Sequence, residues 1–108
     1  MLPKKNRLDK ETYKTIFRDG KNYHTPLLMV KYVKTADTPR FSAVVSKKIF
    51  AKAHDRNEIR RLMYKAVAEN EGDIGSVSAI LILKKQFRKD DKGSLVAEIQ
   101  TVLKNISK

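Results

Sequence analysis

Apolar side chains recur at helical spacing in three segments of the chain and gather in three shorter runs typical of strands. In the first helical segment, Tyr13, Ile16 and Phe17 fall on one face of a helix. Asp9 suits the N-cap of this helix, and Gly20, which lacks a Cβ, suits the position after its last turn. The pattern therefore predicts a short first helix between Asp9 and Gly20.

The second helical segment, residues 52–67, reads KAHDRNEIRRLMYKAV. Asp55 and Glu58 have the spacing of a capping box, with Asp in place of the usual Ser or Thr. We therefore expect Asp55 to be the N-cap, Arg56 to be the first helical residue, and the helix to close within residues 69–75. The buried stripe is predicted to hold Ile59, Leu62, Met63, Ala66 and Val67, and the other side Asn57, Arg60, Arg61 and Tyr64.

Three apolar stretches predict strands, at residues 27–34 (LLMVKYVK), 40–46 (RFSAVVS) and 77–83 (VSAILIL). We expect the first two to form an antiparallel pair. The third is nearly all apolar, as expected of a central strand covered on both faces. Residues 47–53 fit either a short strand or a loop. A last amphipathic helix is predicted from the spacing of Leu95, Val96, Ile99, Val102, Leu103 and Ile106.

The resulting order is α-β-β-(β)-α-β-α, where the bracketed strand stands for residues 47–53. This order predicts an α+β sandwich with one sheet. A length of 108 residues, without an internal repeat or a low-complexity linker, indicates one domain over residues 1–108.

The charge of the chain is strongly positive, with 24 Lys and Arg against 12 Asp and Glu and a formal net charge of +12. Such an excess costs stability through self-repulsion, which a bound polyanion relieves. Nucleic acid is the leading candidate for that polyanion, and an anionic membrane surface is the second.

Several classes of protein are excluded by what the sequence lacks. Without cysteine there are no disulfides, no thiolate catalysis and no cysteine-ligated metal sites. The longest apolar run, residues 79–83, is too short to span a bilayer. No apolar region follows the basic residues near the N-terminus, so a secretory signal is not expected. We therefore expect a cytoplasmic protein that does not enter the membrane.

Cations crowd the start of the second helix, where the macrodipole is already positive and acidic side chains are the ordinary choice. Free N–H groups at a helix start and guanidinium groups beside them both suit phosphate. The alternative is a basic face that merely meets solvent, but the global charge favours phosphate. The basic residues between positions 47 and 65 are Lys47, Lys48, Lys52, Arg56, Arg60, Arg61 and Lys65.

Two aromatic residues, Tyr13 and Phe17, are neighbours on the first helix. They form either a platform on which unpaired bases stack or part of the core. On the strand at 27–34, Tyr32 faces the same choice. It lies on the side of Leu28 and Val30, whereas Lys31 points to the opposite side.

Catalytic patterns are lacking in the sequence. His24 and His54 stand alone without ligand spacing, and no Ser/His/Asp set, HExxH motif or phosphate-binding glycine loop occurs. We therefore expect no metal site and no catalytic residue, and a binding protein rather than a self-sufficient enzyme.

Residues 45–67, VSKKIFAKAHDRNEIRRLMYKAV, resemble the signature of the bacterial ribonuclease P protein subunit. In that family a VSKK-type strand end precedes a helix with the pattern R-N-x-I-[KR]-R, called the RNR motif. Residues 6–23 look like the family's first helix and glycine turn, and residues 75–85 like the strand after the RNR helix. The terminal helix also matches in place.

The resemblance implies a compact α-β-β-β-α-β-α sandwich with one central mixed sheet and a left-handed βαβ crossover. It also implies a protein that joins a large catalytic RNA, which removes the 5′ leader of precursor tRNA. The RNA, with bound Mg²⁺, performs the hydrolysis, and the protein holds the leader and strengthens the binding of substrate and metal. The alternative reading is a ribosomal or other structural RNA-binding protein, and a further rival is an autonomous nuclease.

Carried over by position, the resemblance assigns two groups of residues. Lys47, Lys48, Lys52, Arg56, Asn57, Arg60, Arg61 and Lys65 would face the catalytic RNA, and Tyr13, Phe17 and Lys31 the leader. The sequence departs from the family at Glu58, where many relatives have Arg, and at Tyr64, where a basic residue is common. The aromatic residue that usually lines the leader cleft aligns nearer Lys31 than Tyr32.

Overall fold

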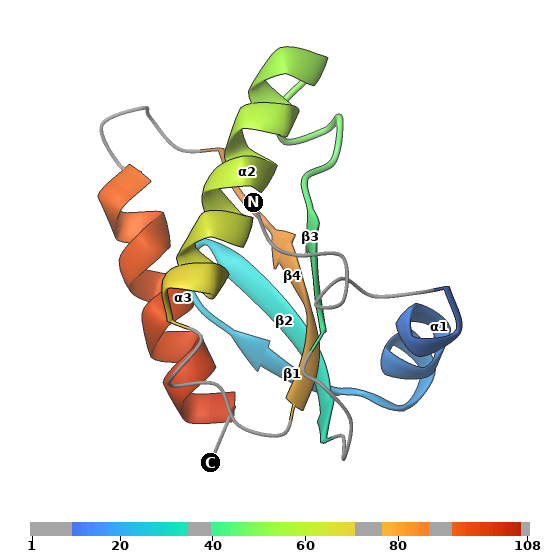
Figure 1. Cartoon of the computed structure of the whole chain (residues 1–108). Helices are drawn as coiled ribbons and strands as arrows, with labels where there is room; N and C mark the ends of the chain where they lie inside the picture. The colour runs from blue at the N-terminus through green and yellow to red at the C-terminus, as the bar shows by residue number, and fades with distance from the viewer. Residues whose placement is uncertain (1–9, 35–39, 71–76, 87–91, 107–108) are drawn as a thin grey trace.

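The computed structural model describes residues 10–34, 40–70, 77–86 and 92–106. Within these residues the chain forms an α+β fold in the order α-β-β-β-α-β-α, as predicted (Figure 1). The helices are α1 (Lys10–Asp19), α2 (Ala53–Glu69) and α3 (Lys92–Ile106). The strands are β1 (Lys21–His24), β2 (Leu28–Lys34), β3 (Phe41–Val44) and β4 (Val77–Leu83).

The four strands of the described chain form one mixed sheet in the order β1-β2-β4-β3. Strand β2 is antiparallel to β1 and β4, whereas β3 is parallel to β4. The predicted antiparallel pairing of β2 with β3 is therefore wrong, because β4 lies between them. The physical reason is that β4 is apolar at almost every position. Such a strand is most stable at the centre of the sheet, where both faces of the strand are covered.

The additional strand, which the sequence suggested at residues 47–53, also lies elsewhere. Residues 47–53 are not a strand, since Ser46–Phe50 make a turn and α2 begins at Ala53. The additional strand is β1, with the sequence KNYH, at one edge of the sheet. Its side chains are mostly exposed and polar, so it shows no apolar alternation from which to predict it.

Helices cover the sheet on both faces (Figure 1). Helices α2 and α3 pack on one face and bury a core that contains Val30, Ala43 and Leu81. On the opposite face lies α1, whose Ile16 is fully buried, as is Ile80 of β4. This arrangement confirms the prediction that residues 77–83 form a central strand with both faces covered.

Helix α2 connects β3 to β4, so it crosses the core face between two adjacent parallel strands. The predicted stripe of α2 is confirmed, with Ile59, Met63, Ala66 and Val67 buried and Leu62 packed against the core. In α3, Leu95, Ile99, Val102, Leu103 and Ile106 are buried and Val96 is half-buried, which confirms that helix as well.

The predicted start of α2 at Asp55 is wrong. The helix begins at Ala53, and Lys52 is the N-cap residue, with extended backbone angles (φ −82°, ψ 130°) and no side-chain cap. The backbone N–H of Arg56 already donates to the carbonyl of Lys52 at 3.1 Å, which places Asp55 inside the first turn. Glu58, the other half of the proposed capping box, pairs with Lys92 of α3 instead. The helix ends at Glu69, within the predicted range, and residues 71–75 lie outside the described residues.

Gly20 follows the last residue of α1, as predicted, and its N–H donates to the carbonyl of Ile16 at 2.8 Å. A Cβ at this position would lie 2.3 Å from the carbonyl oxygen of Ile16 and 3.2 Å from that of Tyr32. The glycine is therefore needed for the close approach of the end of α1 to β2. The predicted N-cap, Asp9, lies outside the described residues.

No helix in the described part of the chain has the length and apolar character needed to cross a membrane.

Candidate nucleic-acid interface

The turn after β3 presents two of the predicted RNA-binding lysines. The N–H groups of Ile49 and Phe50 both donate to the carbonyl of Ser46 at 3.1 Å. Lys47 and Lys48 lie between these anchors and are exposed. Ile49 and Phe50 pack against the core, so the turn has an apolar base and a cationic tip.

The start of α2 adds a second set of donors next to this turn. The N-cap side chain of Lys52 is exposed and makes no capping hydrogen bond, and no side chain among the described residues accepts from the first N–H groups of the helix. These orphan N–H groups and the positive end of the helix dipole favour an anion. Asp55 is the acidic residue of the first turn.

The outer side of α2 carries the remaining predicted residues. Asn57, Arg61 and Lys65 are exposed, and Arg60 is half-buried and donates to the Asn57 side chain. The Lys65 ammonium lies 3.9 Å from the Glu69 carboxylate, a solvent-exposed pair of little strength. Arg61 makes no hydrogen bond or ion pair to the residues that the structure describes. We name the following set the α2 basic surface: Lys47, Lys48, Lys52, Arg56, Asn57, Arg60, Arg61 and Lys65.

Tyr64 does not belong to the exposed side of α2, contrary to the prediction. Its ring is half-buried against the core, and its hydroxyl accepts a hydrogen bond from the N–H of Ala43 at 3.1 Å. Since β3 is an edge strand, this N–H would otherwise lack a partner within the sheet. Tyr64 therefore covers the free edge of β3.

Lys92 is a neighbour of the α2 basic surface that sequence reasoning missed. Its ammonium lies 2.7 Å from the carboxylate of Glu58, although the two residues are 34 positions apart. Nothing in the sequence around Lys92 signals this contact, because it depends on how α3 packs against α2. The pair offsets the negative charge of Glu58 in the N-terminal half of α2.

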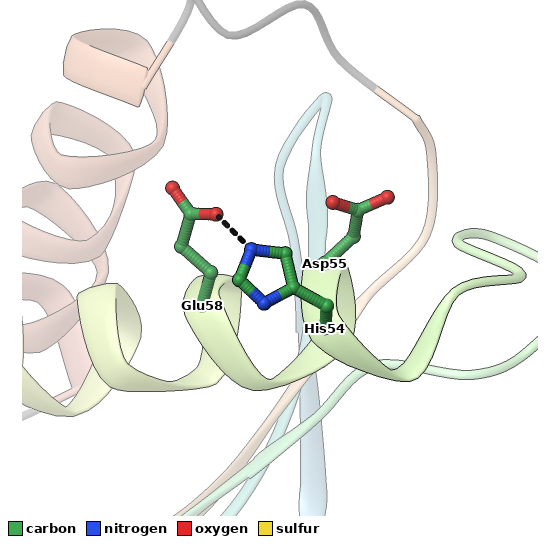
Figure 2. Close-up of side chains that lie close together, drawn as sticks. All are labelled: His54, Asp55 and Glu58. Carbon is green, nitrogen blue, oxygen red and sulfur yellow. Dashed lines mark ion pairs between the residues drawn. The ribbon is translucent and has the colours of Figure 1, made fainter.

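His54, Asp55 and Glu58 form a small cluster of side chains that can ligate metals, with the His54 ring between the two carboxylates (Figure 2). The His54 Nε2 atom lies 3.8 Å from a carboxylate oxygen of Glu58, and Lys92 holds the other oxygen. Mg²⁺ prefers an octahedron of oxygen ligands. An imidazole nitrogen and a competing ammonium do not fit that preference, so this cluster is not suited to Mg²⁺.

On the other face of the sheet, the predicted leader residues do come together. The rings of Tyr13 and Phe17 have centroids 4.9 Å apart, and the ammonium of Lys31 lies 5.4 Å from the centroid of Phe17. Phe17 is 43% exposed, whereas Tyr13 is half-buried, and that burial raises the pKa of its phenol above the ordinary value. We name Tyr13, Phe17 and Lys31 the α1 aromatic cluster.

Tyr32 is not part of this cluster, because it faces the core on the side of Leu28 and Val30, as the strand alternation predicted. The sheet face beside α1 instead presents a row of half-buried apolar residues that sequence reasoning did not single out. Met29 pairs with Ile82, and Ile82 with Val44, across three adjacent strands. The row extends the surface next to Phe17 with apolar side chains.

Comparison with known proteins agrees with both the fold and the motif. The ribonuclease P family model matches residues 2–107. Among solved structures, the RNase P protein from Thermotoga maritima is 25% identical, with a TM-score of 0.77 over 94% of this chain and 98% of that one. The RNase P protein from Staphylococcus aureus has the same fold, with a TM-score of 0.71, 22% identity and 95% of each chain covered. A search of curated protein sequences finds no match.

The chain is a small α+β protein whose mixed four-stranded sheet and order of helices and strands match the RNase P protein fold. The chain belongs to the ribonuclease P family, as a protein subunit of the bacterial enzyme. Membership of that family implies an RNA partner in a ribonucleoprotein. The assignment of individual residues to that RNA or to its substrate stays a prediction.

Proposed function

We propose that the α2 basic surface binds the catalytic RNA of ribonuclease P and that the α1 aromatic cluster binds the 5′ leader of precursor tRNA. The protein acts in the cytoplasm, where the assembled particle removes the leader. Mg²⁺ is held mainly by the RNA and the substrate, in keeping with the poor fit of the His54, Asp55 and Glu58 cluster to this ion.

The observation that carries this proposal is the cationic, uncapped start of α2. Lys47, Lys48 and Lys52 are exposed there, next to N–H groups that no side chain of the described residues caps. Mutual repulsion among these cations and the helix dipole is unfavourable in the free protein. An RNA backbone relieves it by placing phosphates among the charges and releasing its counterions.

The leader site rests on the combination of an exposed ring and a cation. Phe17 offers a face on which an unpaired base can stack, a contact worth about 1–3 kcal/mol per base. Lys31, whose ammonium lies 5.4 Å from that ring, can meet the adjacent phosphate. The half-buried row of Met29, Ile82 and Val44 continues the surface, so a single strand finds apolar contacts beyond the first base.

The two surfaces lie on opposite faces of the sheet, since α2 packs on one face and α1 on the other (Figure 1). This separation allows the protein to contact the catalytic RNA and the leader at the same time. Its positive charge lowers the repulsion between these two polyanions, so less Mg²⁺ is needed to bring them together. The role of the chain is therefore to bind and orient the substrate, and no side chain is assigned to the chemical step.

The test is reconstitution with a bacterial catalytic RNA and a precursor tRNA at limiting Mg²⁺. We expect the protein to restore leader removal at an Mg²⁺ concentration at which the RNA alone is nearly inactive. A structural RNA-binding protein would bind the RNA without restoring cleavage, and an autonomous nuclease would cleave without added RNA. Either outcome would contradict the proposal.

A further inference from the structure

The side chain of Arg56 turns back toward the loop that precedes α2. Its Nη1 atom donates to the carbonyl of Phe50 at 3.0 Å and to that of Ala51 at 2.7 Å. Nη1 carries two hydrogens, so both are used by these carbonyls. The Arg56 side chain is half-buried, in contrast to the exposed Arg61 one turn further along the helix.

These two hydrogen bonds close a short ring of chain. The ring runs from Phe50 to Arg56, whose N–H donates to the carbonyl of Lys52. It shares Phe50 with the adjoining turn, in which the carbonyl of Ser46 accepts from Ile49 and Phe50. Lys47 and Lys48 lie in this adjoining turn. The ring therefore fixes where the two exposed lysines lie relative to the first turn of α2.

We infer that Arg56 is a positioning residue, which holds the turn of Lys47 and Lys48 in place for RNA through the carbonyls of Phe50 and Ala51. This inference rests on the proposed function, since it takes the two lysines as phosphate ligands. Without Arg56, the carbonyls of Phe50 and Ala51 lose a charged donor, and the turn has fewer restraints than its backbone hydrogen bonds to Ser46, its packing on the core and Arg56 give it together. The lysines then sample more positions, and each phosphate contact carries a larger entropic cost.

A direct phosphate ligand and a positioning residue leave different signatures in a double-mutant cycle. We would measure the affinity of the catalytic RNA for four proteins: the wild type, Arg56→Gln, the double variant Lys47→Gln/Lys48→Gln, and the triple variant that combines them. We expect Arg56→Gln to weaken binding about tenfold in the wild type and less than about threefold without the lysines. Arg61→Gln, combined with the same lysine changes, is the matched control and should be additive.

Amide hydrogen exchange of the free protein gives a second measurement that does not depend on RNA. In Arg56→Gln we expect the N–H groups of Ile49 and Phe50 to exchange at least about tenfold faster, because the ring is open. The amides of β4 serve as a reference for the intact fold and should keep their wild-type protection.

Three results would overturn the inference. Wild-type protection at Ile49 and Phe50 in Arg56→Gln would show that the ring does not depend on the side chain. An equal loss of RNA affinity in both backgrounds would make Arg56 a direct ligand, and the proposed function would stand. Wild-type affinity of Lys47→Gln/Lys48→Gln would remove the turn from the RNA interface, and with it both the inference and that part of the proposed function.

Discussion

The ammonium of Lys92 on α3 lies 2.7 Å from the carboxylate of Glu58 on α2. The contact connects the two helices that cover the core face of the sheet. Lys92 on α3 thus compensates the negative charge of Glu58. The α2 basic surface next to this pair therefore stays positive.

Replacing Glu58 by Gln should strengthen binding of the catalytic RNA. The change removes a negative charge beside the phosphates and frees Lys92, so the dependence of affinity on salt should steepen by about one counterion. The free energy of unfolding should change by less than about 1 kcal/mol, because the side chains of the pair are 37% and 39% exposed. Salt titrations of RNA binding check this, with the exposed Glu11→Gln on α1 as the control for charge alone. Weaker binding of the Glu58 variant would count against the RNA-facing side of α2.

Arg61 offers the plainest test of the α2 basic surface, because its side chain is exposed and unengaged within the described residues. Arg61→Gln should lower RNA affinity and reduce the salt slope by about one counterion, with little change in the melting temperature. The matched control is Lys104→Gln, which removes an exposed charge near the C-terminal end of α3. If both variants weaken binding alike, the effect is one of net charge and not of this surface.

Phe17→Ala should weaken the binding of precursor tRNA more than the binding of mature tRNA. The variant loses a stacking contact of about 1–3 kcal/mol that only a leader nucleotide can make. Phe17→Tyr keeps an aromatic face and should bind nearly as the wild type does. The measurement is the affinity of the assembled particle for precursor tRNA and for mature tRNA, with each variant in turn. Equal weakening of both would instead assign Phe17 to packing against Tyr13.

Tyr64→Phe should destabilise the fold by about 1 kcal/mol, since the N–H of Ala43 loses its acceptor at the edge of the sheet. The salt slope of RNA binding should stay at the wild-type value, because the ring remains and no charge changes. Chemical denaturation, together with the same RNA titration, measures both quantities. A reduced salt slope would place the hydroxyl in the RNA interface and contradict the structural role.

Gly20→Ala should destabilise the protein by about 1–3 kcal/mol, because its Cβ would lie 2.3 Å from the carbonyl oxygen of Ile16. Gly93→Ala is the matched control, with no atom within 4 Å of the added Cβ. Near the start of α3 this second change should be neutral or stabilise the protein by up to about 1 kcal/mol. Thermal unfolding of the two variants makes the comparison. Equal stability of both would contradict the close contact of Gly20 with the carbonyl of Ile16.

Much of the fold could be predicted from the sequence where local pattern and burial coincide. Strand β4 and the stripes of α2 and α3 have enough apolar positions to identify both their type and their buried side. Strand β1 could not be found, because four mostly exposed residues at a sheet edge carry no such pattern. The order of the strands could not be predicted either. Strands β2 and β3 are neighbours in the sequence, which suggested that they pair, but each of them pairs with β4 instead.

The same distinction applies to the interface. Helical and strand periodicity predicted that Tyr13 and Phe17 share a face and that Lys31 points away from Tyr32, and the structure brings all three predicted leader residues together. Periodicity could not predict that Tyr64 reaches the edge of β3, because a half-buried tyrosine lies at the border of the helix stripe. It also placed the start of α2 too late, since Asp55 lies inside the first turn and Glu58 pairs with Lys92 instead of capping the helix.

The central place of β4 also sets the order in which the molecule can be completed during translation. Strand β3 pairs only with β4 in the sheet, and β2 has β4 along one whole edge. A nascent chain that has not yet reached Val77 therefore lacks the strand that joins β3 to the β1–β2 pair, however much of α2 has formed. The chain must therefore emerge from the ribosome as far as Leu83 before these strands join one sheet, so the sheet does not close strand by strand from β1 onward.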